Sequence, residues 1–275
     1  RFPLAKRRAA EHEGAMLRSF KRRNALSGHQ TPTDGPRPEA TCYVVGDIHG
    51  RADLLDAMLG LIDAHIGGTT PDDPQLVFLG DYIDHGPDSA AVLDRLQALK
   101  RDFPNNVTCL MGNHERMLLD FLDDPAVRGP RWMRNGGGPA VESILPTARA
   151  PDASDPAEHF ITLSADIRDG LGRDTLAWLR SLPLTWSSGN LWVTHAGADP
   201  LRPMQDQSAR VLLWGHPEFE TAERGDGVWV AYGHIERDSP GITDGRIALD
   251  TGAWNSGRLS AIAVAPDGTH TFLQT

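Results

Sequence analysis

Residues Gln75–Ser89 read QLVFLGDYIDHGPDS, a short apolar run followed by a glycine and two closely spaced carboxylates. Short apolar runs bounded by glycine are typical of buried strands, and loops at strand ends concentrate binding and catalytic residues. After Pro87 the apolar residues recur three and four positions apart, which predicts a helix. The stretch therefore predicts a strand, a turn that carries Asp81 and Asp84, and a helix.

The same arrangement occurs once before this stretch and once after it. Residues 42–45 precede the turn GDIHG at 46–50, and residues 107–111 precede GNHE at 112–115. Three successive units predict a parallel, right-handed βαβαβ core. Because the carboxyl ends of parallel strands meet at one edge of a sheet, we expect the polar residues of the turns to face one crevice. These residues are Asp47, His49, Asp81, Asp84, Asn113 and His114.

The second half of the chain is rich in short apolar runs that predict strands. Three of them, at 191–194, 211–214 and 228–232, lead to His195, His216 and His234. Further strands are predicted at 247–249, 259–263 and 271–273. Because these strands are short and close together, we expect them to form a second sheet packed on the first. The predicted fold class is α/β, with two packed mixed β-sheets flanked by helices.

The composition of the 275-residue chain excludes some classes of function. A formal net charge of −10 argues against non-specific nucleic-acid binding. No apolar stretch approaches the ~20 residues needed to cross a bilayer, and no signal peptide is recognisable. We therefore expect a cytoplasmic protein with neither nucleic acid nor membrane as partner. Cys42 and Cys109 lie within apolar runs and are expected to be buried free thiols.

The N-terminal region differs in charge from the rest of the chain. Residues 1–23 carry eight basic and two acidic side chains, and residues 28–38, GHQTPTDGPRP, are typical of a linker. We predict a basic extension and linker over 1–40 and one domain over 41–275. The extension is either a helical arm that docks on an acidic surface or partner, or a mobile tail.

Six side chains with nitrogen or oxygen donors stand at predicted strand ends. Carboxylates, imidazoles and an amide without nearby thiolates suit manganese, iron or zinc, and not a structural zinc site built from cysteines. Two cations ~3.5–4 Å apart need a shared carboxylate, which Asp81 in the middle unit can supply. The candidate ligands are Asp47, His49, Asp81, Asn113, His195 and His234.

These motifs resemble the three signature blocks of the calcineurin-like metallophosphoesterases. They are most similar to the phosphoprotein phosphatase branch in its bacterial serine/threonine phosphatase form. His195 and His234 fall where that family places its last two metal ligands, and the match runs from about residue 42 to 252. The resemblance implies a hydrolase of phosphoric esters, with a phosphoprotein or a small phosphoester as substrate.

The resemblance also implies two divalent metal ions, manganese first, with iron or zinc as alternatives. One ion would be held by Asp47, His49 and Asp81, and the other by Asp81, Asn113, His195 and His234. A hydroxide that bridges the metals would attack phosphorus in line. His114 would protonate the leaving group, Asp84 would orient His114, and Asn113 would also contact the substrate.

One part of the pattern departs from the family. Its middle block is GDxxDRG, with an arginine that grips the substrate phosphate, and this chain has His85 there. A second phosphate-binding arginine of the bacterial relatives corresponds most nearly to His216. Arginine offers a permanent charge and a two-pronged fork, whereas histidine is only partly charged near neutrality.

The departure leaves several functions open. Because both replacements can still contact phosphate or metal, a changed substrate is favoured over random drift. The chain is then a phosphatase of phosphoserine or phosphothreonine, a hydrolase of phosphodiesters or dinucleoside polyphosphates, or a non-catalytic phosphate-binding relative. The oligomeric state and the native substrate stay open.

Overall fold

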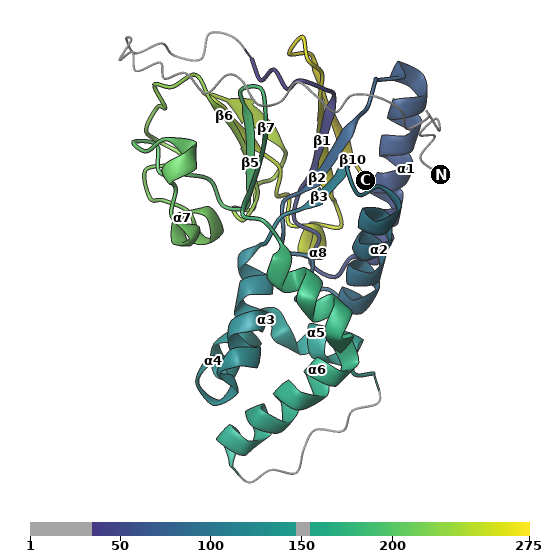
Figure 1. Cartoon of the computed structure of the whole chain (residues 1–275), viewed down its shortest axis with the longest axis vertical. Helices are drawn as coiled ribbons and strands as arrows, with labels where there is room; N and C mark the ends of the chain where they lie inside the picture. The colour runs from purple at the N-terminus through teal and green to yellow at the C-terminus, as the bar shows by residue number, and fades with distance from the viewer. Residues whose placement is uncertain (1–34, 147–154) are drawn as a thin grey trace, which may run out of the picture.

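The computed structural model describes residues 35–146 and 155–275, so most of the predicted basic extension, residues 1–34, lies outside the described residues. Two five-stranded sheets pack against each other, and helices cover the outer face of the first (Figure 1). This arrangement confirms the predicted fold of two packed mixed sheets flanked by helices. Residues 35–40 join the second sheet through hydrogen bonds from Arg37 N to Asn190 Oδ1 and from Glu39 N to Ser188 Oγ.

The first sheet contains the three predicted strand–turn–helix units. Its strands, in the order β10-β9-β1-β2-β3, are β10 (His270–Gln274), β9 (Ser260–Val264), β1 (Cys42–Val45), β2 (Gln75–Phe78) and β3 (Val107–Cys109). Strands β1, β2 and β3 are parallel, and α1 (Ala52–Thr69) and α2 (Ser89–Asp102) connect them. The parallel core is therefore as predicted.

The C-terminal strands occupy a different sheet from the one expected. Strand β9 pairs antiparallel with β1, and β10 pairs with β9, so both extend the first sheet. Because β2 occupies only one edge of β1, the other edge would expose unpaired backbone groups, and β9 satisfies them. The prediction that these strands belong to the second sheet was wrong.

The second sheet has the order β4-β5-β6-β8-β7. Its strands are β4 (Thr185–Ser188), β5 (Leu191–Thr194), β6 (Trp229–Tyr232), β8 (Arg246–Ala248) and β7 (Gly241–Thr243). Alternate residues of β1 face opposite ways: Cys42 and Val44 pack between the sheets, whereas Tyr43 and Val45 pack under the helices. Burial on both faces explains the near-continuous apolar strands of the first sheet.

The predicted strand at 211–214 is a helix. Helix α7 (Ala209–Trp214) begins where the Ser208 hydroxyl accepts a hydrogen bond from Val211 N, which is a standard helix cap. A short apolar run does not distinguish a buried strand from a short helix. Here the hydrogen bond from Val211 N to the Ser208 hydroxyl favours the helix, whereas the apolar content fits either structure.

A group of helices extends below the two sheets in Figure 1. It contains α3 (Asn113–Asp123), α4 (Pro125–Trp132), the irregular turn η1 (Met133–Gly137), α5 (Gly138–Ile144) and α6 (Pro156–Ser181). Two further short helices, η2 (Met204–Asp206) and α8 (Ala253–Ser256), lie in connections of the second half. Cys42 and Cys109 are buried free thiols, as expected. Among the described helices, none is long and apolar enough to cross a membrane.

Candidate metal centre and active site

The predicted ligands all follow strands, and most of them meet at one place. Asp47 and His49 follow β1, Asp81 follows β2, Asn113 begins α3 after β3, and His195 and His234 follow β5 and β6. Among the predicted ligands, two overlapping groups each have ligand atoms that lie within 4.8 Å of one another. They are Asp47 with His49 and Asp81, and Asp81 with His195 and His234. Asp81 belongs to both groups.

The backbone at these positions is strained. Five site residues other than glycine have φ angles in the left-handed region, which side chains with a Cβ seldom adopt. They are His49 (46°), Asp81 (51°), Asp84 (70°), His85 (63°) and His234 (65°). The turns also approach closely, since a Cβ on Gly86 would lie 2.1 Å from the carbonyl oxygen of His49. Such strain persists at sites where the surrounding structure fixes functional side chains.

The carboxylate of Asp81 lies at the centre of the histidines. Its Oδ2 atom is 3.5 Å from Nε2 of His49, 3.4 Å from Nε2 of His195 and 3.9 Å from Nε2 of His114. Its Oδ1 atom accepts a hydrogen bond from the backbone N–H of His114 at 3.0 Å. Oδ2 is therefore the oxygen that faces the shared space.

In two of these histidines the second ring nitrogen, Nδ1, faces a backbone carbonyl oxygen. Nδ1 of His49 lies 2.8 Å from the carbonyl oxygen of Ile83, and Nδ1 of His195 lies 3.1 Å from that of Leu79. Because a carbonyl only accepts, Nδ1 carries the hydrogen and Nε2 presents a lone pair towards Asp81. Burial lowers the pKa of both imidazoles well below the usual value, which keeps them neutral. Metal-binding histidines are typically oriented in this way.

Three buried acceptor atoms of the site have no hydrogen-bond donor among the described residues and suit a cation better. Nε2 of His195 lies 2.7 Å from Oδ1 of Asn113, so two acceptors face each other. Oδ1 of Asp47 is buried and has no hydrogen-bond partner among the described residues. A divalent cation is the group that carboxylate, amide and imidazole lone pairs bind together. The donor set therefore fits the metal ions that the sequence predicts.

The buried carboxylates of the centre have raised pKa values. Burial raises the pKa of Asp81 to about 6 and that of Asp250 to about 6. Burial, together with the neighbouring Asp250 and Asp81, raises the pKa of Asp47 well above its usual range. A site that accumulates buried negative charge in this way favours positive ligands. Asp250 was missed as a site residue, although it too follows a strand, β8.

His114 is in a different electrostatic environment from the other histidines. Its Nδ1 lies 2.7 Å from Oδ2 of Asp84. Burial opposes its protonation, but Asp81 and the hydrogen bond to Asp84 prevail and raise the pKa of His114 to about 9. His114 therefore carries a proton at neutral pH, next to the candidate metal ligands.

Asp84 has a second partner that sequence reasoning missed. The indole N–H of Trp132 donates to both carboxylate oxygens of Asp84, at 3.1 and 3.0 Å. Trp132 is fully buried and lies at the end of α4, 48 positions along the chain. No local signal in the sequence connects it with Asp84.

Glu115 holds the turns of the second and third units together. Its carboxylate accepts hydrogen bonds from the backbone N–H groups of Gly112, Asp81 and Tyr82, at 2.9, 2.9 and 2.8 Å. The side chain is completely buried, and burial raises its pKa to about 7. The GNHE motif includes this residue, but sequence reasoning assigned it no role.

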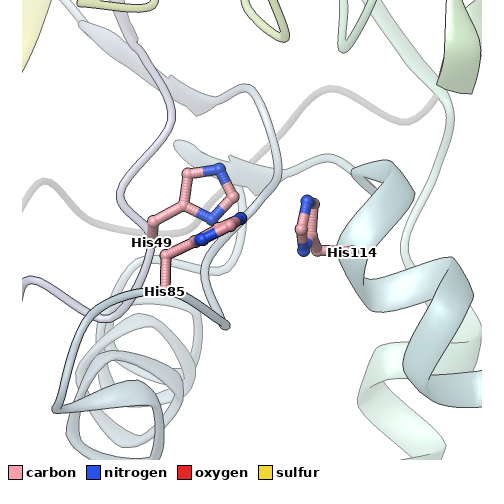
Figure 2. A group of neighbouring side chains, drawn as sticks. All are labelled: His49, His85 and His114. Atoms are coloured by element: carbon pink, nitrogen blue, oxygen red, sulfur yellow. The ribbon is translucent and has the colours of Figure 1, made fainter. Parts of the chain in front are cut away.

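His85 lies inside the site. Figure 2 shows its ring beside those of His49 and His114, and the ring centres are 5.0 and 5.2 Å away. The same ring stacks on Trp254 at 4.7 Å, and burial lowers its pKa. His85 therefore presents a neutral imidazole towards the shared space.

His216 is placed differently. It follows helix α7, and its Nε2 atom lies 4.0 Å from Oδ2 of Asp199. Within the described residues, no hydrogen bond or ring contact joins it to another predicted site residue. The structure thus brings together the predicted ligands, His114, Asp84 and His85, whereas no described contact joins His216 to them.

Comparison with known proteins matches this chain to one protein family. The model of the calcineurin-like phosphoesterase family matches residues 40–245, which is more than half of the chain. A symmetrical bis(5'-nucleosyl)-tetraphosphatase of Janthinobacterium is 31% identical over 192 residues, which cover 70% of this chain and 54% of that protein. Serine/threonine-protein phosphatase 2 of Escherichia coli is 28% identical over 231 residues, which cover 79% of this chain and 90% of that protein.

Among solved structures, the chain resembles a cold-active protein-tyrosine phosphatase of a psychrophilic Shewanella. The TM-score is 0.56 with 19% identity, and the match covers 90% of this chain and 85% of that one. At this identity the likeness concerns the fold. The chain spans about half the length of the tetraphosphatase that it matches.

Proposed function

The chain belongs to the calcineurin-like phosphoesterase family, and we propose that it hydrolyses phosphoric esters at a centre of two divalent cations. The observation that carries this proposal is the orientation of two imidazoles around one carboxylate. His49 and His195 each direct Nε2 towards Oδ2 of Asp81, at 3.5 and 3.4 Å, while their Nδ1 atoms face carbonyl oxygens.

We assign the ligands by the two groups that share Asp81. Asp47 and His49 would complete one cation site with Asp81, and His195, His234 and Asn113 would complete the other. Manganese is the cation proposed first, with iron and zinc as alternatives, because carboxylate, imidazole and amide donors suit all three. When bound, two such cations acidify a water molecule and stabilise charge on phosphoryl oxygens.

The chain's own residues supply the proton. His114, whose pKa is raised to about 9, holds a proton at neutral pH and would donate it from Nε2 to the leaving oxygen. Asp84 accepts from Nδ1 of His114 and fixes the direction of the ring. Trp132 in turn holds the Asp84 carboxylate in place. Asn113, next to His114, is proposed to contact the substrate as well as a cation.

Two substrate classes remain candidates. The serine/threonine phosphatase relative supports a phosphomonoester, such as a phosphoprotein. The symmetrical tetraphosphatase relative supports a dinucleoside polyphosphate, and with it the class of substrates that includes phosphodiesters, whose phosphates each carry one charge. The neutral imidazole of His85 favours the second class, because each phosphate of a diester carries one charge and needs less compensation than a monoester dianion.

Hydrolysis of three compounds by the manganese-loaded protein distinguishes these candidates. They are p-nitrophenyl phosphate, bis(p-nitrophenyl) phosphate and diadenosine tetraphosphate. A monoester preference above tenfold selects the phosphatase, and the reverse selects the diesterase. Asp81→Asn is the control that should abolish either activity. If the protein binds manganese but hydrolyses none of the three, it is a non-catalytic phosphate-binding relative.

A further inference from the structure

Arg131 reaches from helix α4, in the group of helices α3–α6, to helix α7. It lies next to Trp132 near the end of α4, and its guanidinium carbon stands 4.6 Å over the ring centre of Trp214, at the end of α7. Figure 1 shows α4 below α7 on the same side of the molecule. A guanidinium stacked on an indole in this way is held in place without losing its hydrogen-bond donors.

Trp214 connects this contact with the candidate metal centre. Its ring meets that of His234 edge to face, with the ring centres 6.4 Å apart. Trp214 therefore contacts both the guanidinium of Arg131 and a proposed metal ligand. Trp132, the next residue along the chain, donates its indole N–H to Asp84. The end of α4 that carries Arg131 is therefore held against Asp84 and His114, the proposed catalytic pair.

The donors of Arg131 are free within the described part of the chain. Its side chain is exposed and stacks on Trp214, and no hydrogen bond or ion pair joins it to a described residue. Arg246 provides a contrast, since it also lies over an aromatic ring, that of Phe219, but is buried and donates to the carbonyl oxygens of Phe219 and Ala222. Arg246 uses its donors to hold the fold, whereas those of Arg131 point to no described acceptor.

The site lacks a permanent positive charge at the positions where the family pattern has arginine. Histidines stand at these positions, 85 and 216, and Nε2 of His216 lies 4.0 Å from Oδ2 of Asp199. Through Trp214, a guanidinium without a described acceptor is connected to a centre that contains several buried carboxylates. Charge-assisted, two-pronged hydrogen bonds are the contacts that arginine makes best with phosphate.

We propose that Arg131 binds the phosphate of the substrate and provides the permanent charge that His85 and His216 do not. This arginine lies on helix α4 and not in a strand-end loop. Stacking on Trp214 would hold its guanidinium in place. This inference rests on the proposed function, because it assumes that a phosphate occupies the space beside the metals.

The test compares Arg131→Gln with Arg128→Gln, which removes the same charge from an exposed position one turn earlier on α4. Binding of inorganic phosphate to the manganese-loaded proteins is measured by calorimetry. KM and kcat are measured with whichever of the three test compounds the wild type hydrolyses with the highest kcat/KM. Arg131→Gln should weaken phosphate binding and lower kcat/KM by about tenfold to a hundredfold, since charged hydrogen bonds contribute about 1.5–3 kcal/mol. Arg131→Lys should fall between, and Arg128→Gln should stay within twofold.

Two results would overturn the inference. One is Arg131→Gln with phosphate affinity and kcat/KM within twofold of the wild type. The other is an equal loss in Arg128→Gln, which would reveal a general effect of charge. A wild-type protein without activity on any ester would instead remove the proposed function, and the calorimetric comparison would still decide whether Arg131 binds phosphate.

Discussion

Trp132 donates its indole N–H to both oxygens of the Asp84 carboxylate, at 3.1 and 3.0 Å, and thereby connects helix α4 to the proposed catalytic pair of Asp84 and His114. Asp84 is completely buried, so this bond and that with His114 replace the water that a carboxylate normally has. Orientation of His114 therefore depends on a residue outside the strand-end loops.

Replacement of Trp132 by phenylalanine should loosen this orientation. The stack on Phe121, at 4.8 Å, can persist, but a buried carboxylate loses a donor. We expect a loss of about 1–3 kcal/mol in the free energy of unfolding and a fall in kcat with little change in KM. Trp178→Phe, which alters a half-buried stack on Tyr82, is the control for kcat. An unchanged kcat in Trp132→Phe would contradict the orienting role.

Asp84→Asn should change the pH dependence of the reaction. His114 must be protonated to donate, so activity of the wild type should fall as pH rises through about 9. Both the hydrogen bond and the charge of Asp84 raise the pKa of His114. Their loss should therefore lower the pH at which activity begins to fall on the alkaline side. Profiles of kcat/KM from pH 6 to 10 measure the shift, with the exposed Asp56→Asn as control. If kcat/KM fell at the same alkaline pH in both variants, His114 would be excluded as the acid.

The three turns could be predicted from the sequence because each is local. In every unit a buried strand, a polar turn and a helix follow one another within one short stretch, so spacing alone brings Asp47, Asp81 and Asn113 to the same edge of the sheet. The order of the parallel strands follows from the same repetition. The family resemblance and the fold class are confirmed by the family match and by the two sheets.

The features that sequence reasoning missed depend on contacts between distant segments. Trp132 reaches Asp84 across 48 positions, and Asp250 approaches Asp47 only because β8 lies beside β6. The run at 211–214 has the composition of a strand, and only the cap at Ser208 makes it a helix. Hydrophobic periodicity indicates that a segment is buried but not which other segment it packs against, so it could not predict these contacts.

Glu115→Ala should destabilise the protein more than an ordinary surface change. Three buried backbone N–H groups, those of Gly112, Asp81 and Tyr82, would lose their acceptor. Because each unsatisfied buried donor costs about 1–3 kcal/mol, we expect a loss of at least about 3 kcal/mol in the free energy of unfolding. Urea unfolding measures it, with the exposed Glu142→Ala as control. A loss below about 1 kcal/mol would show that the turns are held by other contacts.

His85→Arg, alone and together with His216→Arg, should shift the substrate preference towards monoesters. A guanidinium at position 85 would bring a permanent charge to the space between His49 and His114, where the present imidazole is neutral. The ratio of kcat/KM for p-nitrophenyl phosphate to that for its bis ester should rise about tenfold or more. An unchanged ratio would mean that selectivity is set elsewhere, for example by Arg131.

Removal and restoration of metal should have an effect on stability that grows with pH. Below pH 5 the carboxyls of Asp81 and Asp250, with pKa values raised to about 6, are largely protonated in the folded protein. A cation must then displace protons, so it binds weakly. As pH rises through about 6 these groups ionise, their mutual repulsion destabilises the metal-free fold, and a cation both binds more tightly and removes that repulsion.

We therefore expect manganese to raise the melting temperature more at pH 7.5 than at pH 5.5, relative to the same protein with a chelator. The ligand histidines do not reverse this sign, because their pKa values are lowered and they are already neutral over most of the range. Asp81→Asn should remove most of the stabilisation at both pH values, since the shared ligand is lost. Equal stabilisation of the wild type at pH 5.5 and 7.5 would show that the buried carboxylates do not bind the cation.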